Sequence, residues 1–173
     1  MTISQDFTST KVEGDALHVR ELDGSYRAAT NHEVIRAARR VLTARMRRGA
    51  ALTSPGDAKD FLRVRLGELE HEVFAILFLD SQHRVLAFRE MFRGTLAQTS
   101  VYPREVIKEA LRLNAGAVIL SHNHPSGMAT PSRADEMLTQ SLVAALRIID
   151  VRVLDHLVIA GDAVSSFAEL GLL

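Results

Sequence analysis

One apolar run, Val73–Leu79, constrains the fold of this chain more than any other feature of its sequence. A strand that exposes one face to water alternates polar and apolar residues, so a nearly continuous apolar run indicates a strand that is covered on both faces. The segment "GAVILS" at residues 116–121 predicts a second buried strand of the same kind. Strands of this type alternate with helical patterns from residue 70 onward, which favours an α/β sandwich.

The remaining segments complete this pattern. The run "VLAFREMF" predicts a strand at residues 85–92, antiparallel to the first because only the turn "DSQHR" separates them. Residues 1–30 are polar and irregular and predict a loose arm with one short strand, and Gly161-Asp162 turns the chain into a short tail. Helices are predicted at residues 31–48, 54–66, 103–113 and 132–149, and a last strand at residues 151–161.

The composition narrows the class of protein. The 173 residues suit one domain with a small extension, divided here into an N-terminal arm and basic helix (residues 1–53) and a main domain (residues 54–173). The absence of cysteine excludes disulfides, thiolate zinc sites and cysteine nucleophiles. The sequence opens without an apolar core of signal-peptide length, and no run approaches the roughly 20 apolar residues that span a bilayer. We therefore expect a cytoplasmic protein that does not enter the membrane.

The stretch "SHNHPSGMATPSRAD" at residues 121–135 gathers the candidate metal ligands. Residues two apart in extended backbone point the same way, so His122 and His124 would aim their imidazoles at one point. Asp135 lies in the first turn of the next helix, where its carboxylate can return to that point as a third ligand. Three ligands leave a fourth position open for water, as in catalytic zinc sites, where this water ionises near neutral pH and becomes a nucleophile. The ligand types favour zinc and are also compatible with Mn, Fe or Ni.

Two other interpretations explain parts of this stretch. Ser132 and Asp135 have the spacing of a capping box, in which the two side chains satisfy backbone groups at the start of a helix. A His-x-His pair in a loop also occurs as a surface feature without a ligand. Neither interpretation explains the two histidines, the Pro-Ser-Gly turn and the capped acid together. A cap that holds Asp135 rigidly would in any case support a metal site rather than compete with it.

The spacing of His122, His124, Ser132 and Asp135 resembles the JAMM signature of MPN/JAB-domain metalloproteases. With "ILSHNHPSG", "PSRAD", "MFRGTLAQTSVYPREV" and "VLDHLVIAG", the pattern resembles the RadC family of bacterial proteins over residues 55–161. The resemblance implies a JAB/MPN fold similar to that of cytidine deaminases, a three-layer α/β sandwich with a central mixed sheet flanked by helices. It also implies a zinc-dependent metallohydrolase, a peptidase or isopeptidase that acts on a peptide or protein substrate.

The same resemblance assigns two catalytic residues. The JAMM pattern has a glutamate at the start of the first core strand, which puts Glu72 in that role; its rivals Glu68, Glu70 and Glu90 do not open the apolar strand. A carboxylate there would take a proton from the metal-activated water and pass it to the leaving amine. Ser132 would donate a hydrogen bond to the oxyanion of the tetrahedral intermediate.

Other features leave alternative functions open. The chain has Asn123 where JAMM deubiquitinases usually have Ser or Thr, which argues against a ubiquitin-type substrate. His156 is interpreted as a core histidine outside the site, and the predicted sheet with exposed helices leaves room for a homodimer. RadC proteins carry a historical DNA-repair label, so the alternative is a DNA-associated repair or recombination accessory protein, or a metal-dependent nuclease with the same site. The arginines that would contact DNA phosphates are Arg36, Arg39, Arg40, Arg47 and Arg48.

Overall fold

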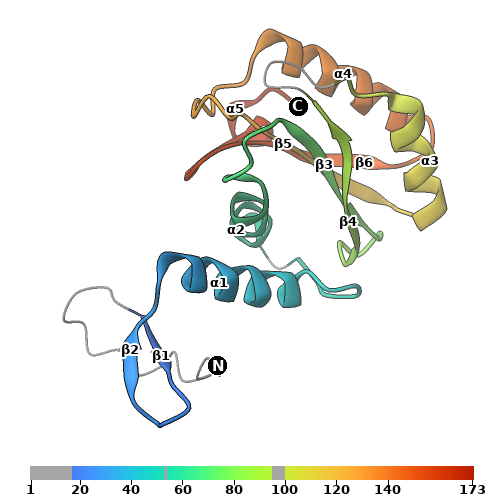
Figure 1. Ribbon diagram of the computed structural model, residues 1–173. Coiled ribbons are helices and arrows are strands. Elements are labelled where there is room, and N and C mark those ends of the chain that lie inside the picture. Colours follow the sequence, from blue (N-terminus) through green and yellow to red (C-terminus); the bar gives the residue numbers. More distant parts are fainter. Residues whose placement is uncertain (1–16, 53, 95–99) are drawn as a thin grey trace. The chain divides into compact units, whose positions relative to one another are not determined.

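The computed structural model describes residues 17–52, 54–94 and 100–173 (Figure 1). Residues 1–16 of the predicted arm, residue 53, and residues 95–99 of the RadC-like segment "MFRGTLAQTSVYPREV" lie outside the described residues. The chain divides into two compact units, residues 1–41 and residues 42–173. The division at residues 53 and 54 that the sequence suggests stays a prediction.

The smaller unit consists, in its described part, of a hairpin and the beginning of a helix. Strands β1 (His18–Arg20) and β2 (Tyr26–Ala28) pair antiparallel, and α1 (Asn31–Arg45) begins in this unit. Arg27 and Glu33 form an ion pair between the hairpin and the helix, with 2.8 Å between Nη2 and Oε1. The hydrogen bonds from Arg27 lower the pKa of Glu33 to about 2. The region predicted as an arm with one short strand therefore contains a hairpin that an ion pair joins to the helix.

The larger unit is a five-stranded mixed sheet with helices on both faces (Figure 1). The strand order is β4-β3-β5-β6-β7. Only β5 and β6 run parallel, and the other three neighbouring pairs are antiparallel. The elements are α2 (Pro55–Leu66), β3 (Val73–Leu79), β4 (Val85–Arg93), α3 (Pro103–Leu113), β5 (Ala117–Asn123), α4 (Arg133–Arg147), β6 (Arg152–Ala160), β7 (Ala163–Ser166) and α5 (Phe167–Leu170).

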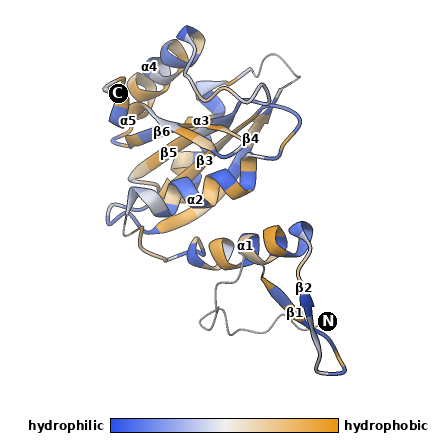
Figure 2. Ribbon diagram, turned by 90° about the vertical axis from the view of Figure 1, so that its left-hand side faces the viewer, coloured by the Kyte–Doolittle hydropathy of each residue, from blue (hydrophilic) through white to orange (hydrophobic). Residues whose placement is uncertain are grey.

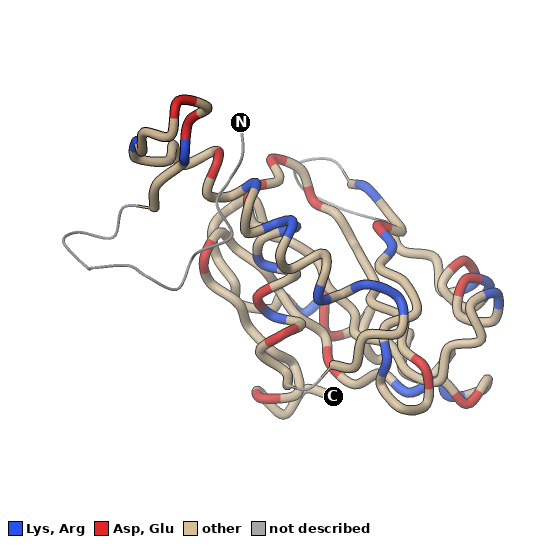
Figure 3. The backbone as a smooth tube through the Cα atoms, turned by 90° about the horizontal axis from the view of Figure 1, so that it is seen from below, with Lys and Arg blue, Asp and Glu red and all other residues tan. Residues whose placement is uncertain are grey.

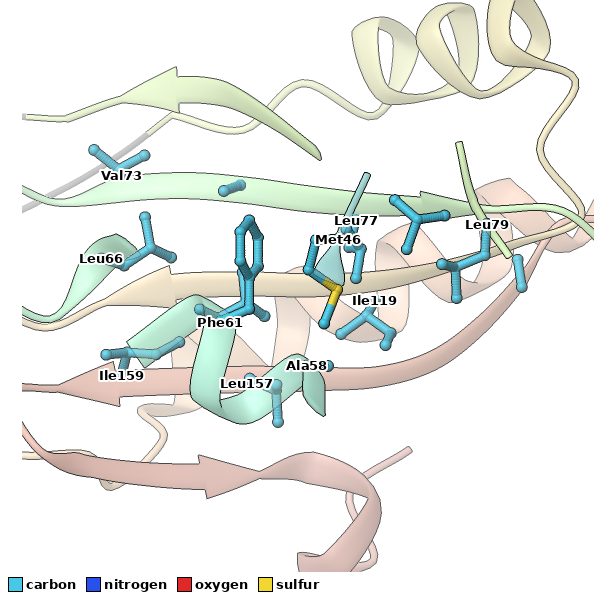
Figure 4. Packing of buried hydrophobic residues seen from close by; sticks show 14 residues of the cluster. Met46, Ala58, Phe61, Leu66, Val73, Leu77, Leu79, Ile119, Leu157 and Ile159 are labelled. Atoms are coloured by element: carbon cyan, nitrogen blue, oxygen red, sulfur yellow. The ribbon is translucent and has the colours of Figure 1, made fainter. Parts of the chain in front are cut away.

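Strand β3 supplies side chains to two separate cores. Because successive residues of a strand point to opposite faces, Leu77 packs with Phe61 of α2 (Figure 4), whereas Phe74 and Ile76 pack on the other face with residues of α3 and α4. The whole of β3 is buried, which confirms the prediction of a strand covered on both faces. The predicted three-layer α/β sandwich with a mixed central sheet is likewise confirmed.

The hydropathy of the elements follows this layering. Hydrophobic colours run along the central strands, whereas the helices show both hydrophilic and hydrophobic stretches (Figure 2). Helices with one apolar side suit the outer layers of a sandwich, where the other side meets water. Within the described ranges, no helix has the length and apolar character needed to cross a membrane.

Two segments extend beyond the sequence-based prediction. Strand β5 continues through Asn123, so that His122 lies within the strand and only His124 follows it. The predicted short tail contains β7 and α5. Asp155 of β6 joins this tail to the sheet by accepting hydrogen bonds from the Ser166 hydroxyl at 2.6 Å and the Ala168 N–H at 3.0 Å. These polar contacts have no hydropathy signal, which is why the pattern of apolar residues did not indicate an ordered tail.

Gly67 at the end of α2 provides a test of the packing of this helix against the sheet. A Cβ atom on Gly67 would lie 2.7 Å from the carbonyl oxygens of both Arg63 and Gly161, and both contacts are with backbone. We expect Gly67→Ala to lower the free energy of unfolding by about 1–3 kcal/mol, because the backbone must shift. Gly56→Ala in the same helix is the control, since its Cβ would meet only the Ser54 hydroxyl at an ordinary 3.5 Å. Urea unfolding measures both variants, and equal stability would contradict the expectation.

Candidate metal centre

The two histidines lie where β5 ends. His122 is the last residue but one of β5 and pairs with Phe74 of β3. His124 follows the strand, and its backbone N–H donates to the Ile159 carbonyl at 2.8 Å, which prolongs the pairing with β6. The two side chains point the same way, as the spacing predicts, and their Nε2 atoms are 2.9 Å apart.

Asp135 reaches the histidines from the first turn of α4. Ser132 is the N-cap of this helix and accepts a hydrogen bond from the Asp135 N–H at 3.2 Å. In return, Oδ2 of Asp135 accepts hydrogen bonds from the Ser132 N–H at 2.7 Å and from its hydroxyl at 2.6 Å. The predicted capping box is confirmed, and its hydrogen bonds orient the carboxylate.

The three residues converge as metal ligands do. Asp135 Oδ1 is 3.3 Å from His122 Nε2, and Oδ2 is 3.6 Å from His124 Nε2. One atom from each residue lies within 4.8 Å of the others, and the three side chains are buried or half-buried. Ligand atoms at about 2.0–2.1 Å from a tetrahedral zinc ion are separated by about 3.3 Å. The group of His122, His124 and Asp135 is therefore compatible with a metal site.

The outer nitrogen of each imidazole also has a partner. His124 Nδ1 lies 2.8 Å from the Met128 carbonyl oxygen. His122 Nδ1 lies 2.8 Å from Nε2 of His156, whose own Nδ1 is 2.6 Å from the Thr139 hydroxyl. Metal-binding histidines almost always use their second nitrogen in this way, because the hydrogen bond orients the ring.

The contact between His122 and His156 is a feature that the sequence analysis missed. His156 is fully buried, as expected of a core histidine, but it contacts a candidate ligand. Parallel pairing places His156 opposite Leu120 of β5, although the two histidines are 34 positions apart in the chain. The signal in the sequence was His156, a polar residue inside an apolar strand. Its partner could not be predicted, because that depends on which strand lies next to β6.

The ionisable groups at this point stabilise a positive charge between them. The hydrogen bond with Asp135 raises the pKa of His124, against the opposing effect of burial. Burial acts to raise the pKa of the Asp135 carboxyl, but its interaction with the two imidazoles outweighs burial and holds that pKa well below its usual range. Burial also lowers the pKa of His156 far below its ordinary value, which keeps this imidazole neutral. A proton or a metal cation is therefore stabilised among the side chains of His122, His124 and Asp135.

Glu72 lines the same cavity as the candidate ligands. The cavity has a volume of about 520 Å³ and includes Glu72, Ser132 and all three candidate ligands in its wall. Glu72 directly precedes β3, and continuing the antiparallel register from the pair Phe74 and His122 places it opposite His124 on the same face. Its charge contributes to the raised pKa of His124. The rival acids Glu68, Glu70 and Glu90 are not among the residues of this cavity wall.

Glu72 and Ser132 are thus brought to the ligands, while their catalytic roles stay predictions. Ser132 presents its hydroxyl to Asp135 Oδ2, so the hydrogen atom assigned to an oxyanion is donated to the candidate ligand in this structure. The direct consequence of this geometry is that Ser132 orients Asp135.

Asn123 clamps the segment that carries Glu72. Its Oδ1 accepts a hydrogen bond from the Val73 N–H at 2.8 Å, and its Nδ2 donates to the carbonyls of Leu69 and His71 at 3.2 and 3.0 Å. The Asn123 residue itself is only 2% exposed, so its amide depends on these protein partners for its hydrogen bonds. A Ser or Thr hydroxyl has a single hydrogen atom and is too short to hold three backbone groups. Asn123, which stands where the JAMM pattern usually has Ser or Thr, therefore has a structural role in holding this backbone segment.

We expect Asn123→Ala to lower the free energy of unfolding by more than its neighbour Ser121→Ala does. The Asn123 variant leaves one buried backbone group, the Val73 N–H, and two partly buried carbonyls without this partner, and the buried group alone costs about 1–3 kcal/mol. Ser121 is equally buried but makes one side-chain bond, to the Ala75 carbonyl at 3.0 Å. Urea unfolding of both variants, with zinc affinity measured in parallel, tests the clamp. Equal losses of stability would contradict it.

Comparison with known proteins agrees with this fold. Residues 52–172 match the family model of the RadC-like JAB domain. A UPF0758 protein of Leptothrix cholodnii is 61% identical over 140 residues, which cover 81% of this chain and 63% of that protein. A UPF0758 protein of Methylibium petroleiphilum is 62% identical over the same shares of the two chains, and one of Polaromonas sp. is 58% identical over 81% of this chain. The chain spans a little over three-fifths of the length of these relatives. It belongs to the RadC-like JAB domain family.

Proposed function

We propose that this chain is a zinc-dependent metallohydrolase of the JAMM type that cleaves a peptide or isopeptide bond. The observation that carries the proposal is the convergence of His122, His124 and Asp135 in a cavity that also contains Glu72. Bound zinc acts as a Lewis acid that lowers the pKa of a coordinated water to about 7. Three protein ligands leave the fourth zinc position open, which is the arrangement of catalytic rather than structural sites.

The residues of the chain have distinct roles in this reaction. Glu72 takes a proton from the attacking water and passes it to the leaving amine, as a general base that becomes a general acid. Ser132 holds Asp135 in its ligand position and donates to the developing oxyanion if its hydroxyl turns from the carboxylate. Asn123 keeps the backbone on either side of Glu72 in place.

The wall of the cavity supports a peptide substrate. Phe74, Val101 and Leu138 form an apolar part of the wall beside the ligands, and Met128 at the edge is 68% exposed. Sites of this composition bury an apolar side chain next to a few polar groups that fix its orientation. An apolar residue adjacent to the cleaved bond is therefore the expected feature of the substrate.

Metal analysis of the purified full chain tests the first step. We expect about one zinc per chain in the wild type and almost none in a His122→Ala, His124→Ala double variant, because two of the three ligands are lost. Hydrolysis of peptide libraries should disappear with a chelator and return with zinc. If the wild type and the variant contain equally little zinc, the proposal fails. Metal-dependent cleavage of DNA instead of peptides would favour the nuclease alternative.

A DNA-associated accessory role is the second candidate, and its basis is the set of arginines on and after α1. Charges of both signs are interspersed over the chain (Figure 3), so DNA binding would depend on this local group. Fluorescence anisotropy with labelled DNA at several salt concentrations tests it, since each lost phosphate contact reduces the salt dependence. Unmeasurable affinity at low salt, or affinity unchanged when Arg39, Arg40, Arg47 and Arg48 become Ala, would exclude this role. The exposed members of the group are Arg36, Arg40, Arg47 and Arg48.

A further inference from the structure

We propose that His156 and Thr139 are positioning residues that fix the proton of His122 on Nδ1, so that its Nε2 lone pair faces the metal. The proposal deepens the proposed function and rests on its metal site. It concerns the direction of three consecutive hydrogen bonds, from the backbone carbonyl of Asp135 to the imidazole of His122.

The direction of these three hydrogen bonds is set at the Asp135 carbonyl. The Thr139 hydroxyl lies 2.6 Å from this oxygen, one turn earlier in α4. A carbonyl oxygen only accepts, so the single hydrogen atom of the hydroxyl points to it. Thr139 Oγ1 is then left as an acceptor. His156 Nδ1, 2.6 Å away, must therefore carry a hydrogen atom and donate it to Thr139.

The same hydrogen-bonding restriction fixes which nitrogen carries hydrogen in His156 and then in the candidate ligand His122. A neutral imidazole carries one hydrogen atom, so a proton on Nδ1 of His156 leaves its Nε2 as an acceptor. His156 is fully buried, which disfavours a second proton. His122 Nδ1, 2.8 Å from this nitrogen, must then be the donor. The consequence is a bare Nε2 on His122, directed toward Asp135.

His124 reaches the same state by an independent contact. Its Nδ1 faces the Met128 carbonyl at 2.8 Å, and a carbonyl can only accept. When the two imidazoles are neutral, both Nε2 lone pairs therefore point into the group, and each orientation begins at a backbone carbonyl. Asp135 takes part twice, since its carbonyl starts the chain to His122 and its carboxylate is the third candidate ligand.

Aromatic rings hold the central member of the chain. Phe167 of α5 stacks on the His156 ring at 4.7 Å between centroids, and Phe74 meets it edge-on at 5.6 Å. These contacts fix the plane of the ring between its two partners. The short helix α5, which the sequence did not indicate, thus contributes to the site through Phe167.

The expected consequence is a loss of metal affinity when the chain of hydrogen bonds is broken. Without the Thr139 hydroxyl, His156 can carry its proton on Nε2 and accept nothing from His122, and His122 then populates the tautomer with hydrogen on the ligand nitrogen. Such outer hydrogen bonds typically account for 10–100-fold in metal affinity. If the substitutions acted through poorer packing alone, the variants would rank differently in zinc affinity.

Two substitutions at one position separate the two explanations. Thr139→Val keeps the shape of the side chain and removes the hydroxyl, whereas Thr139→Ser keeps the hydroxyl and removes a methyl group. We expect Thr139→Val to weaken zinc binding by about 10–100-fold in a chelator competition, and Thr139→Ser to bind like the wild type. A purely structural role predicts the reverse order, and that result would overturn the proposal.

A second readout does not require zinc. In the metal-free full chain at mildly alkaline pH, where imidazoles are neutral, ¹⁵N spectra of the histidine rings report which nitrogen carries hydrogen. We expect His122 with hydrogen on Nδ1 in the wild type and in Thr139→Ser, and a mixture of tautomers in Thr139→Val. Hydrogen on Nε2 of His122 in the wild type would overturn the proposal. If the wild type binds no zinc, the proposed function fails. The spectra still show which ring nitrogen of His122 carries hydrogen.

Discussion

Replacement of Glu72 by Gln is expected to lower kcat of the zinc-loaded protein by about 10²–10⁴-fold, the usual contribution of a general acid–base residue. Gln has nearly the same shape and cannot take a proton from the attacking water. Zinc content should be unchanged, because Glu72 lines the cavity without belonging to the ligand group. Single-turnover peptide hydrolysis and metal analysis of the same preparation measure both effects.

Glu70→Gln is the matched control for this prediction. Glu70 is an exposed acid two positions earlier and is not part of the cavity wall. It should therefore retain the wild-type kcat. A Glu72 variant that hydrolyses peptides as fast as the Glu70 variant would show that the proton is taken by another group.

Replacement of Asp135 by Ala is expected to remove zinc binding and the Asp135 half of the capping box of α4 together. Loss of the whole N-cap costs about 0.5–2 kcal/mol of stability, and loss of its N3 partner is expected to cost less. Loss of the third ligand should reduce zinc from about one ion per chain to almost none. Zinc should then no longer raise the midpoint of thermal unfolding, because only a ligand that binds the native state stabilises it.

The chain contains a matched control for this substitution. Helix α2 begins with a second Ser-x-x-Asp capping box, made by Ser54 and Asp57. Asp57→Ala removes the same half of a capping box without touching the candidate ligands. We expect both variants to lose stability in metal-free protein, and only the Asp135 variant to lose zinc. Full zinc content in Asp135→Ala would contradict a ligand role.

The local properties of the site could be predicted because they depend on spacing along the chain. His122 and His124 point the same way because side chains of an extended backbone repeat every two residues. Ser132 and Asp135 meet because a helix cap joins residues three apart. Glu72 could be assigned only through the resemblance to JAMM proteins, since several acids lie near it in the sequence.

The contacts that complete the site could not be predicted in this way. Asn123 holds backbone groups about 50 positions earlier in the chain, and His156 lies 34 positions after its partner His122. Both contacts require β3 and β6 to lie on either side of β5. An apolar strand fits between many possible neighbours, so its hydropathy does not select them.

The sequence by itself determined that buried strands would alternate with helices and that two imidazoles and a carboxylate would be presented near one strand end. These are consequences of local periodicity and of helix capping. The tertiary structure decided which groups surround those ligands: the chain from Asp135 through Thr139 and His156, and the clamp of Asn123. The physical reason is that strand order is set by burial of the whole sheet, and strand order alone brings distant polar side chains within hydrogen-bonding distance.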